Sequence, residues 1–175
     1  MMALSLVIGV LLLAPLASSL PTGIGGSSIQ TAGCNCHNSV ADSSVAANIE
    51  GFPEQYNASA TYELTISFDG GPSQPGNINL GGFNLWASEG VFTPTDGLTS
   101  LWAGSVNEVV HTEAGNDYTS WVVDWTAPES GKEVDFILHV NSVNGDGLQT
   151  GQLDQWNRAT FTIQSSFGLV GEVIP

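Results

Sequence analysis

The residues best suited to chemistry lie near the start of the chain, in the tetrapeptide Cys34-Asn35-Cys36-His37. Covalent haem attachment normally uses the pattern Cys-x-x-Cys-His, in which two thioethers hold the porphyrin and the adjacent histidine binds the iron. In this chain one residue rather than two separates the cysteines, so the sulfurs would have to reach two fixed vinyl positions from a shorter segment. Two alternatives stay open: a copper or zinc ion held by both thiolates and His37, and a reduced or redox-active thiol pair without a cofactor.

A haem iron bound by His37 would also have a sixth position, which is either open or filled by a second ligand. The chain contains two further histidines, His111 and His139. Either could reach a haem carried by a loop, although a strand histidine on its own is more often a structural residue than a ligand. Beside such a cluster the case for a ligand is stronger, and His111 is the candidate that we retain. We therefore predict a cofactor site formed by Cys34, Cys36, His37 and His111, with His37 and His111 as metal ligands.

The charge of the chain excludes one large class of partners. There are 17 acidic residues against two basic ones, Lys132 and Arg158, which gives a formal net charge of −15. Binding to nucleic acid requires clusters of lysine and arginine that displace counterions from the phosphates, so we expect no nucleic-acid partner. The sequence also contains no nucleophile elbow, P-loop, dinucleotide fingerprint or zinc-protease motif, and we expect no enzymatic activity.

The first 20 residues form an apolar segment without a charged side chain. Ala17-Ser18-Ser19 offers small residues at the positions that a signal peptidase reads, which favours a cleaved signal peptide over a retained membrane anchor. In either case we expect export to the cell surface or the extracellular space. Membrane association would come from this leader, residues 1–20, or from an anchor after the tail, residues 166–175. Between them we expect a Gly- and Ser-rich, extended lead-in that carries the cluster, residues 21–43, and one domain, residues 44–165.

The body of the chain alternates between apolar and polar residues with the period of a β-strand. In residues 61–68, Leu64, Ile66 and Phe68 share one face while polar side chains occupy the other, as in a half-buried strand. Two antiparallel sheets packed face to face are the economical way to bury many such strands. The sequence therefore predicts an all-β, immunoglobulin-like antiparallel β-sandwich of seven to eight strands with almost no helix. The expected strands cover residues 45–49, 61–68, 82–87, 101–106, 108–112, 121–125, 134–140 and 161–163.

Clusters of Gly, Pro, Asn and Asp separate the expected strands. One of them, Asn144-Gly145-Asp146-Gly147 with Asp154 nearby, offers oxygen ligands for Ca²⁺. It lacks the alternating acidic positions and the terminal Glu of an EF-hand loop, so a plain turn is favoured. The bulky candidates for the core or its rim are Trp86, Trp102, Trp121 and Trp125.

The order of these features is similar to that of a known family. It is carried by the cluster, by Gly81-Gly82-Phe83, by Val110-His111-Thr112, by Trp125-Thr126-Ala127-Pro128 and by Val143-Asn144-Gly145-Asp146-Gly147. On these motifs, residues 30–165 resemble the choice-of-anchor V domain family, which is similar to the Reeler (reelin N-terminal) domain.

The resemblance implies a secreted or surface-anchored immunoglobulin-like sandwich, usually followed by a C-terminal anchor. Many members carry Cys-x-x-Cys-His near the start, which corresponds to Cys34–His37 here, and His111 stands at the His-Thr position of the family. The spacer that is one residue short is a departure from this pattern.

Two functional hypotheses follow. The first is an exported electron-transfer module that holds a haem, or copper or zinc, at the cluster and acts on a redox partner. The second is a non-catalytic adhesion or recognition module without a cofactor, whose loops bind an extracellular protein or a glycan.

Overall fold

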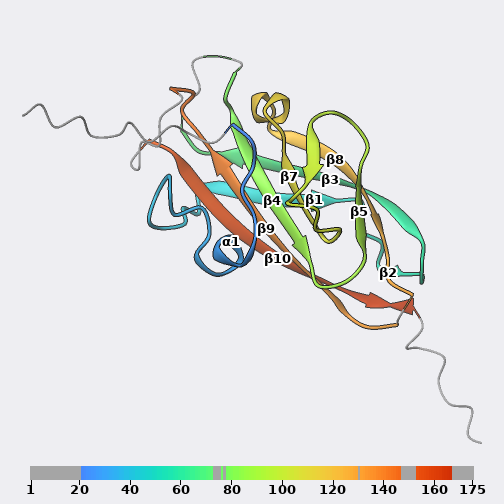
Figure 1. Ribbon diagram of the computed structural model, residues 1–175. Coiled ribbons are helices and arrows are strands. Elements are labelled where there is room, and N and C mark those ends of the chain that lie inside the picture. The colour runs from blue at the N-terminus through green and yellow to red at the C-terminus, as the bar shows by residue number, and fades with distance from the viewer. Residues whose placement is uncertain (1–20, 73–75, 77, 130, 147–152, 167–175) are drawn as a thin grey trace, which may run out of the picture.

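The computed structural model describes residues 21–72, 76, 78–129, 131–146 and 153–166, which form ten strands arranged in two sheets (Figure 1). The predicted leader, residues 1–20, and residues 167–175 of the tail lie outside this part of the chain. Within it, no helix has the length and apolar character needed to cross a membrane.

The smaller sheet has four strands and the larger sheet has six. The order in the smaller sheet is β1 (Val45–Glu50), β3 (Thr61–Gly70), β8 (Ser120–Thr126) and β5 (Val91–Pro94). The order in the larger sheet is β2 (Gln55–Tyr56), β10 (Gln155–Ser165), β9 (Val134–Ser142), β4 (Gly81–Ala87), β7 (Glu108–His111) and β6 (Thr99–Leu101). Neighbouring strands are antiparallel, except that the short β2 runs parallel to β10.

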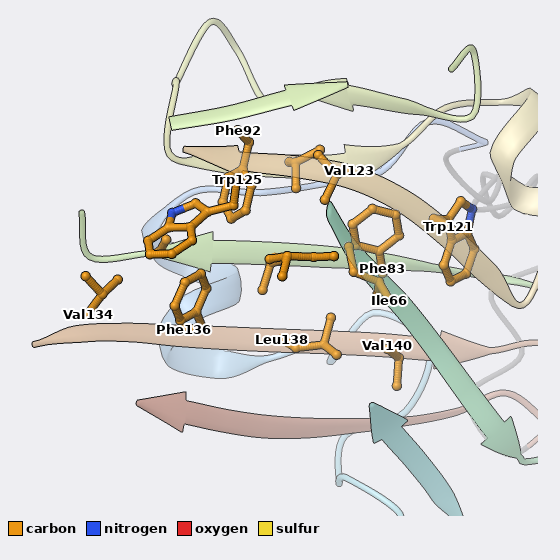
Figure 2. Packing of buried hydrophobic residues seen from close by; sticks show 14 of the residues in the cluster. Ile66, Phe83, Phe92, Trp121, Val123, Trp125, Val134, Phe136, Leu138 and Val140 are labelled. Atoms are coloured by element: carbon orange, nitrogen blue, oxygen red, sulfur yellow. The ribbon is translucent and has the colours of Figure 1, made fainter. Parts of the chain in front are cut away.

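The core lies between the two sheets and is built from the alternating apolar residues of the strands. Trp125 of β8 packs against Phe136 of β9 with ring centroids 5.0 Å apart, and Phe83 of β4 packs against Trp121 of β8 at 4.8 Å (Figure 2). Edge-to-face and tilted pairs of this kind fill the space between sheets and add to the free energy gained by burial. The alternation seen in the sequence therefore identified the inward faces correctly, and the all-β sandwich is confirmed.

Two local features differ from the expected strands. The expected strand 101–106 is replaced by β6, which ends at Leu101, and the chain then turns with positive φ angles at Ala103 and Gly104. The short strands β2 and β5 were not expected, because they carry too few residues for alternation to be visible. The helices of the described residues are short, α1 (Ser27–Ala32) and the 3-10 turn η1 (Ala114–Asp117), in agreement with the expectation of almost no helix.

Helix α1 belongs to a segment, residues 21–42, that lies against the outer face of the larger sheet, and we call it the covering segment. Figure 1 shows it in blue beside β9 and β10. It was expected to be an extended lead-in. Instead, it binds the sheet along its whole length: Gly23 N–H donates to His111 O at one end, and Asp42 N–H donates to Trp156 O at the other, at 3.0 and 2.7 Å.

The outer face of the larger sheet explains why this segment is held. By strand alternation Asn84, Glu108, His139 and Trp156 point away from the core, yet all four are buried. The covering segment supplies hydrogen bonds to two of them. Gly26 N–H donates to Glu108 Oε1 at 2.7 Å, and Trp156 Nε1–H donates to Asn38 O at 2.8 Å. Buried polar groups are costly unless they are paired, so these contacts fix the covering segment to the sheet.

Helix α1 is too short to be stable by itself, and its ends show what stabilises it. It begins after Gly26, whose amide binds Glu108, and it ends at Gly33, which has φ +71°. A Cβ atom at Gly33 would lie 2.2 Å from the Trp156 ring, so only glycine allows this approach. The helix therefore depends on contacts with the sheet, and these contacts cannot be predicted from the sequence of the helix itself.

The core contact between the sheets generates a stability prediction. Phe136→Ala removes a fully buried ring that packs on Trp125 and Phe92, and we expect the free energy of unfolding to fall by about 3–5 kcal/mol. Chemical denaturation followed by tryptophan fluorescence measures this. Val106→Ala is the control, because Val106 is half exposed, and it should change the value by less than about 0.5 kcal/mol. Equal effects of the two substitutions would contradict this account of the core.

Candidate functional site

A pocket lies between the covering segment and one end of the larger sheet. The space inside it is about 100 Å³ and its mouth is open to solvent, so a ligand larger than this would extend out of the pocket. All four residues predicted from the sequence line it: Cys34, Cys36 and His37 from the covering segment, and His111 from the end of β7. The structure therefore brings together a histidine and a cluster that lie far apart in the chain.

The two cysteines are free thiols that differ in exposure. Both follow α1, and His37 N–H donates to Cys34 O at 3.3 Å, which closes a turn across the cluster. Cys36 is exposed, whereas Cys34 is partly covered. Burial raises the pKa of the Cys34 thiol to about 12, and the neighbouring Cys36 adds to the rise. Cys34 is therefore a neutral thiol at physiological pH in the protein without a ligand.

His37 is held by a buried carboxylate. Its Nδ1 lies 2.8 Å from Oδ2 of Asp154, whose side chain is fully buried, while the His37 side chain is 15% exposed. A carboxylate only accepts hydrogen bonds, so Nδ1 carries the hydrogen and Nε2 is the nitrogen left for a ligand. A metal-binding histidine commonly donates its other ring N–H to a carboxylate in this way. No signal in the sequence predicts this pairing, because Asp154 stands there only near the turn at Asn144.

His111 interrupts the hydrogen bonding between β4 and β7. Its Nδ1 lies 3.1 Å from the backbone nitrogen of Phe83 and 3.2 Å from the backbone oxygen of the same residue. Within the described chain, Nε2 has no hydrogen-bond partner. In the tautomer with hydrogen on Nδ1, the ring donates to Phe83 O and Nε2 presents a lone pair, whereas in the other tautomer Phe83 N–H donates to Nδ1 and Nε2 carries the hydrogen. Burial lowers the pKa of His111, which keeps the imidazole neutral and able to bind a metal.

A glycine makes room for this ring. A Cβ atom at Gly82 would lie 2.2 Å from Cε1 of His111 and 2.5 Å from its Nδ1, so the imidazole lies directly against the Gly82 backbone. Gly81-Gly82-Phe83 appeared in the sequence only as a motif of the resemblance. Its physical role in this structure is to admit the side chain of His111 into the strand ladder.

The rest of the lining combines apolar and amide side chains. Phe83 and Ile29 are buried and line the pocket, together with Asn84 and Asn141. Glu108 fixes the amide of Asn84 by accepting from Nδ2 at 2.8 Å. The Oδ1 atoms of Asn84 and Asn141 are buried and have no partner among the described residues. Buried acceptors without partners are uncommon and are satisfied by water or by a ligand.

The donors of the pocket do not converge on one point. In the described part of the chain, no three His, Cys, Asp or Glu side chains are close enough together to hold a metal ion. Zinc ligands must lie about 2.0–2.3 Å from the ion, so this arrangement is not a preformed zinc site. A haem would use these residues differently, because the cysteines would attach the porphyrin while only the histidines would have to reach its iron.

The turn at residues 144–146 is held by one hydrogen bond within the turn and one to Asp154. Asn144 N–H donates to Asp154 Oδ1 at 3.0 Å, and Asp146 N–H donates to Asn144 Oδ1 at 3.1 Å. Asp154, which the sequence suggested as a neighbouring Ca²⁺ ligand, thus binds His37 and this turn instead. Gly147 lies outside the described residues.

His139 does not line the pocket. It lies on the outer face of β9, opposite Leu138, as its position in the alternation predicted, and its ring is 6.2 Å from that of Trp156. It is 1% exposed, and neither ring nitrogen has a partner among the described residues. Desolvation, with a smaller contribution from Arg158, lowers its pKa to about 4. Of the two further histidines, only His111, the candidate retained from the sequence, lines the pocket.

Comparison with known proteins finds similarity to solved structures. One is the Reelin-N domain of F-spondin, 21% identical over 71% of this chain and 88% of that chain, with a TM-score of 0.44. Another is the reeler domain of human F-spondin, 19% identical over 71% and 90%, with a TM-score of 0.46. A third is AvmM, which catalyses macrocyclization in alchivemycin A biosynthesis, 11% identical over 71% and 91%, with a TM-score of 0.39.

The F-spondin structures are of the domain type named in the resemblance, and none of the three structures tests the choice-of-anchor V name. No protein-family model and no curated protein matches the chain.

The contact between Gly82 and His111 generates a prediction. Gly82→Ala places a methyl group where the imidazole lies, so we expect the ring to move out towards solvent and its pKa to rise towards the ordinary value of about 6.5. NMR titration of the three histidines measures this. Gly97→Ala is the matched control, because a Cβ atom there meets nothing within 4 Å. An unchanged His111 titration in Gly82→Ala would contradict the proposed packing.

Burial of His139 generates a prediction for the pH dependence of stability. With a pKa of about 4 in the folded protein and about 6.5 when unfolded, His139 binds its proton more readily in the unfolded chain between these values. Stability should therefore be fully retained above about pH 6.5 and fall as the pH decreases, by about 3 kcal/mol at pH 4. His139→Leu should remove this component, as measured by urea denaturation at pH 7 and pH 4.5. Parallel losses in both proteins would show that other groups are responsible.

Proposed function

We propose that this protein is an exported electron-transfer module that holds a haem of the c type in the pocket between the covering segment and the larger sheet. The observation that supports this proposal is the shared pocket of Cys34, Cys36, His37 and His111. If His111 lay near the cluster only by chance, the chain would not need a glycine at position 82 to make room for the imidazole. The apolar and amide lining is also of the kind that surrounds buried cofactors.

The arrangement of the donors favours haem over a single copper or zinc ion. A single ion would need three or four donors within a few ångströms of one point, and the described side chains do not meet this condition. In a haem site the cysteines would attach the porphyrin and the histidines would hold the iron, so the four side chains would not all have to meet at one ion. The donors line one pocket without forming a cluster of three among the described residues, which supports haem over a single ion.

Each residue has a distinct role in this proposal. Cys34 and Cys36 would form the thioethers, and His37 would offer Nε2 as an axial ligand from the residue that follows. His111 would offer Nε2 as the second axial ligand, because its Nδ1 is occupied by the Phe83 backbone. Phe83, buried in the core and lining the pocket, limits access of water. When bound, a haem supplies one-electron redox chemistry.

Export and partner choice rest on the sequence. The apolar leader at residues 1–20 supports export to the cell surface. The net charge of −15 favours a redox partner with a basic surface, because complementary charge speeds encounter and orients the two proteins.

Expression in a host that exports and attaches haem tests this proposal. The purified protein should show a Soret band that persists on the denatured chain, since thioethers survive unfolding. Cys34→Ser with Cys36→Ser should abolish covalent haem, and His111→Gln should retain the haem but change its absorption spectrum. His139→Leu is the matched histidine control and should leave the spectrum unchanged, because His139 does not line the pocket.

Other outcomes decide against the proposal. Copper or zinc found by elemental analysis, without haem, would replace it by the single-ion alternative. Absence of both haem and bound metal in the exported protein would overturn it in favour of a recognition module without a cofactor.

A further inference from the structure

We infer that Asp154 is a positioning residue, whose carboxylate selects the Nδ1–H tautomer of His37 and so keeps Nε2 available as a ligand in the pocket. This inference rests on the proposed function for its purpose, but the tautomer itself can be observed in the protein without a cofactor. Asp154 is not part of the cluster, and it comes from the segment that leads into β10.

The first argument is the geometry around the carboxylate. One oxygen, Oδ2, accepts from His37 Nδ1 at 2.8 Å, and the other, Oδ1, accepts from the backbone of Asn144 at 3.0 Å. The backbone oxygen of Asp154 also accepts from Asn38 Nδ2 at 3.5 Å. Asp154 is therefore held from both sides and cannot rotate without losing a hydrogen bond.

The second argument is the free-energy cost of burying the Asp154 carboxylate. Asp154 is 0% exposed, and a buried carboxylate is unfavourable unless it is paired and hydrogen-bonded. Holding the turn alone would need only one neutral acceptor for Asn144 N–H. The other carboxylate oxygen, Oδ2, accepts from His37 Nδ1. While Nδ1 makes this hydrogen bond, it cannot bind a ligand in the pocket.

The third argument is the direction of the hydrogen bond. Because a carboxylate has no hydrogen to donate, it forces the neutral imidazole to carry its hydrogen on Nδ1. An amide in the same place would keep its oxygen for Asn144 N–H and present an N–H₂ group to His37. Nδ1 would then accept, the hydrogen would move to Nε2, and the lone pair needed for a metal would be lost.

The decisive experiment is nitrogen NMR of the histidine rings in the protein without a cofactor, at a pH of about 8, where imidazole is neutral. The chain has three histidines, so the ring signals can be assigned by substitution. We expect the Nδ1–H tautomer for His37 in the natural sequence and the Nε2–H tautomer in Asp154→Asn. Asp42→Asn is the matched control, because Asp42 also ends a turn of the covering segment but binds Ser44 and Gln155, and it should leave His37 unchanged.

The tautomer of His37 is measured in the natural sequence without any variant, so this part of the test remains valid even if Asp154→Asn does not fold. An Nε2–H tautomer for His37 in the natural sequence would overturn the inference, and so would an unchanged tautomer in folded Asp154→Asn.

A second measurement uses the haem-loaded protein. Covalent haem should remain in Asp154→Asn, because the thioethers form on Cys34 and Cys36. In this variant His37 should bind the iron more weakly, so added imidazole should replace it more easily. The imidazole concentration needed should be about 10- to 100-fold lower than for the natural sequence, which is the usual effect of losing such a supporting carboxylate. Equal imidazole concentrations in both proteins would overturn the inference while leaving the proposed function intact. Failure of the natural sequence to carry haem, with the expected tautomers, would overturn the proposed function and leave Asp154 as the group that orients His37.

Discussion

The larger sheet buries its inner face and also the part of its outer face that lies beneath the covering segment, and the need to satisfy the polar groups there shapes the rest of the molecule. Its inner face packs against the smaller sheet through apolar side chains, as any sandwich does. Its outer face carries Glu108, Asn84 and the indole N–H of Trp156. Partners for the glutamate and the indole come from the backbone of the covering segment, at Gly26 and Asn38. The segment before the first strand is thus an integral layer of the fold.

This layer carries the cysteines and His37 to the sheet. Because the covering segment is fixed at Gly23 next to His111 and at Asp42 next to Trp156, the residues between these points have a defined place over the ends of β4 and β7. The pocket forms where the covering segment meets the strand ends. Its residues therefore come from loops and strand termini that a rigid sheet positions, which is the usual location of binding sites on sandwiches.

The pocket is arranged to hold two imidazoles, each with one nitrogen already engaged. His37 is bound by the carboxylate of Asp154, and His111 is bound by the backbone of Phe83. These contacts fix the orientation of both rings, and under the proposed function the remaining nitrogen of each would bind the iron. Preorganisation of this kind reduces the entropy lost on binding and restricts which ligand geometries are accepted.

The sequence by itself determined the sandwich, its inward faces and the donor atoms of the cluster. Alternation in residues 134–140 placed Leu138 in the core and His139 on the opposite face, because successive side chains of a strand point to opposite sides whatever the rest of the chain does. The donor atoms of the tetrapeptide that begins at Cys34 likewise follow from its residue types alone. Both properties depend on neighbours in the chain and can be derived from it.

Only the tertiary structure decided which histidine lines the pocket beside the cluster and what supports the cluster. His111 and His139 are both strand residues with apolar neighbours, and they differ because Gly82 admits one to the pocket while Trp156 lies beside the other. The hydrogen bond between His37 and Asp154 joins residues 117 positions apart. Such contacts are set by how the layers pack, and packing depends on the shape of the whole core and not on any local period in the sequence.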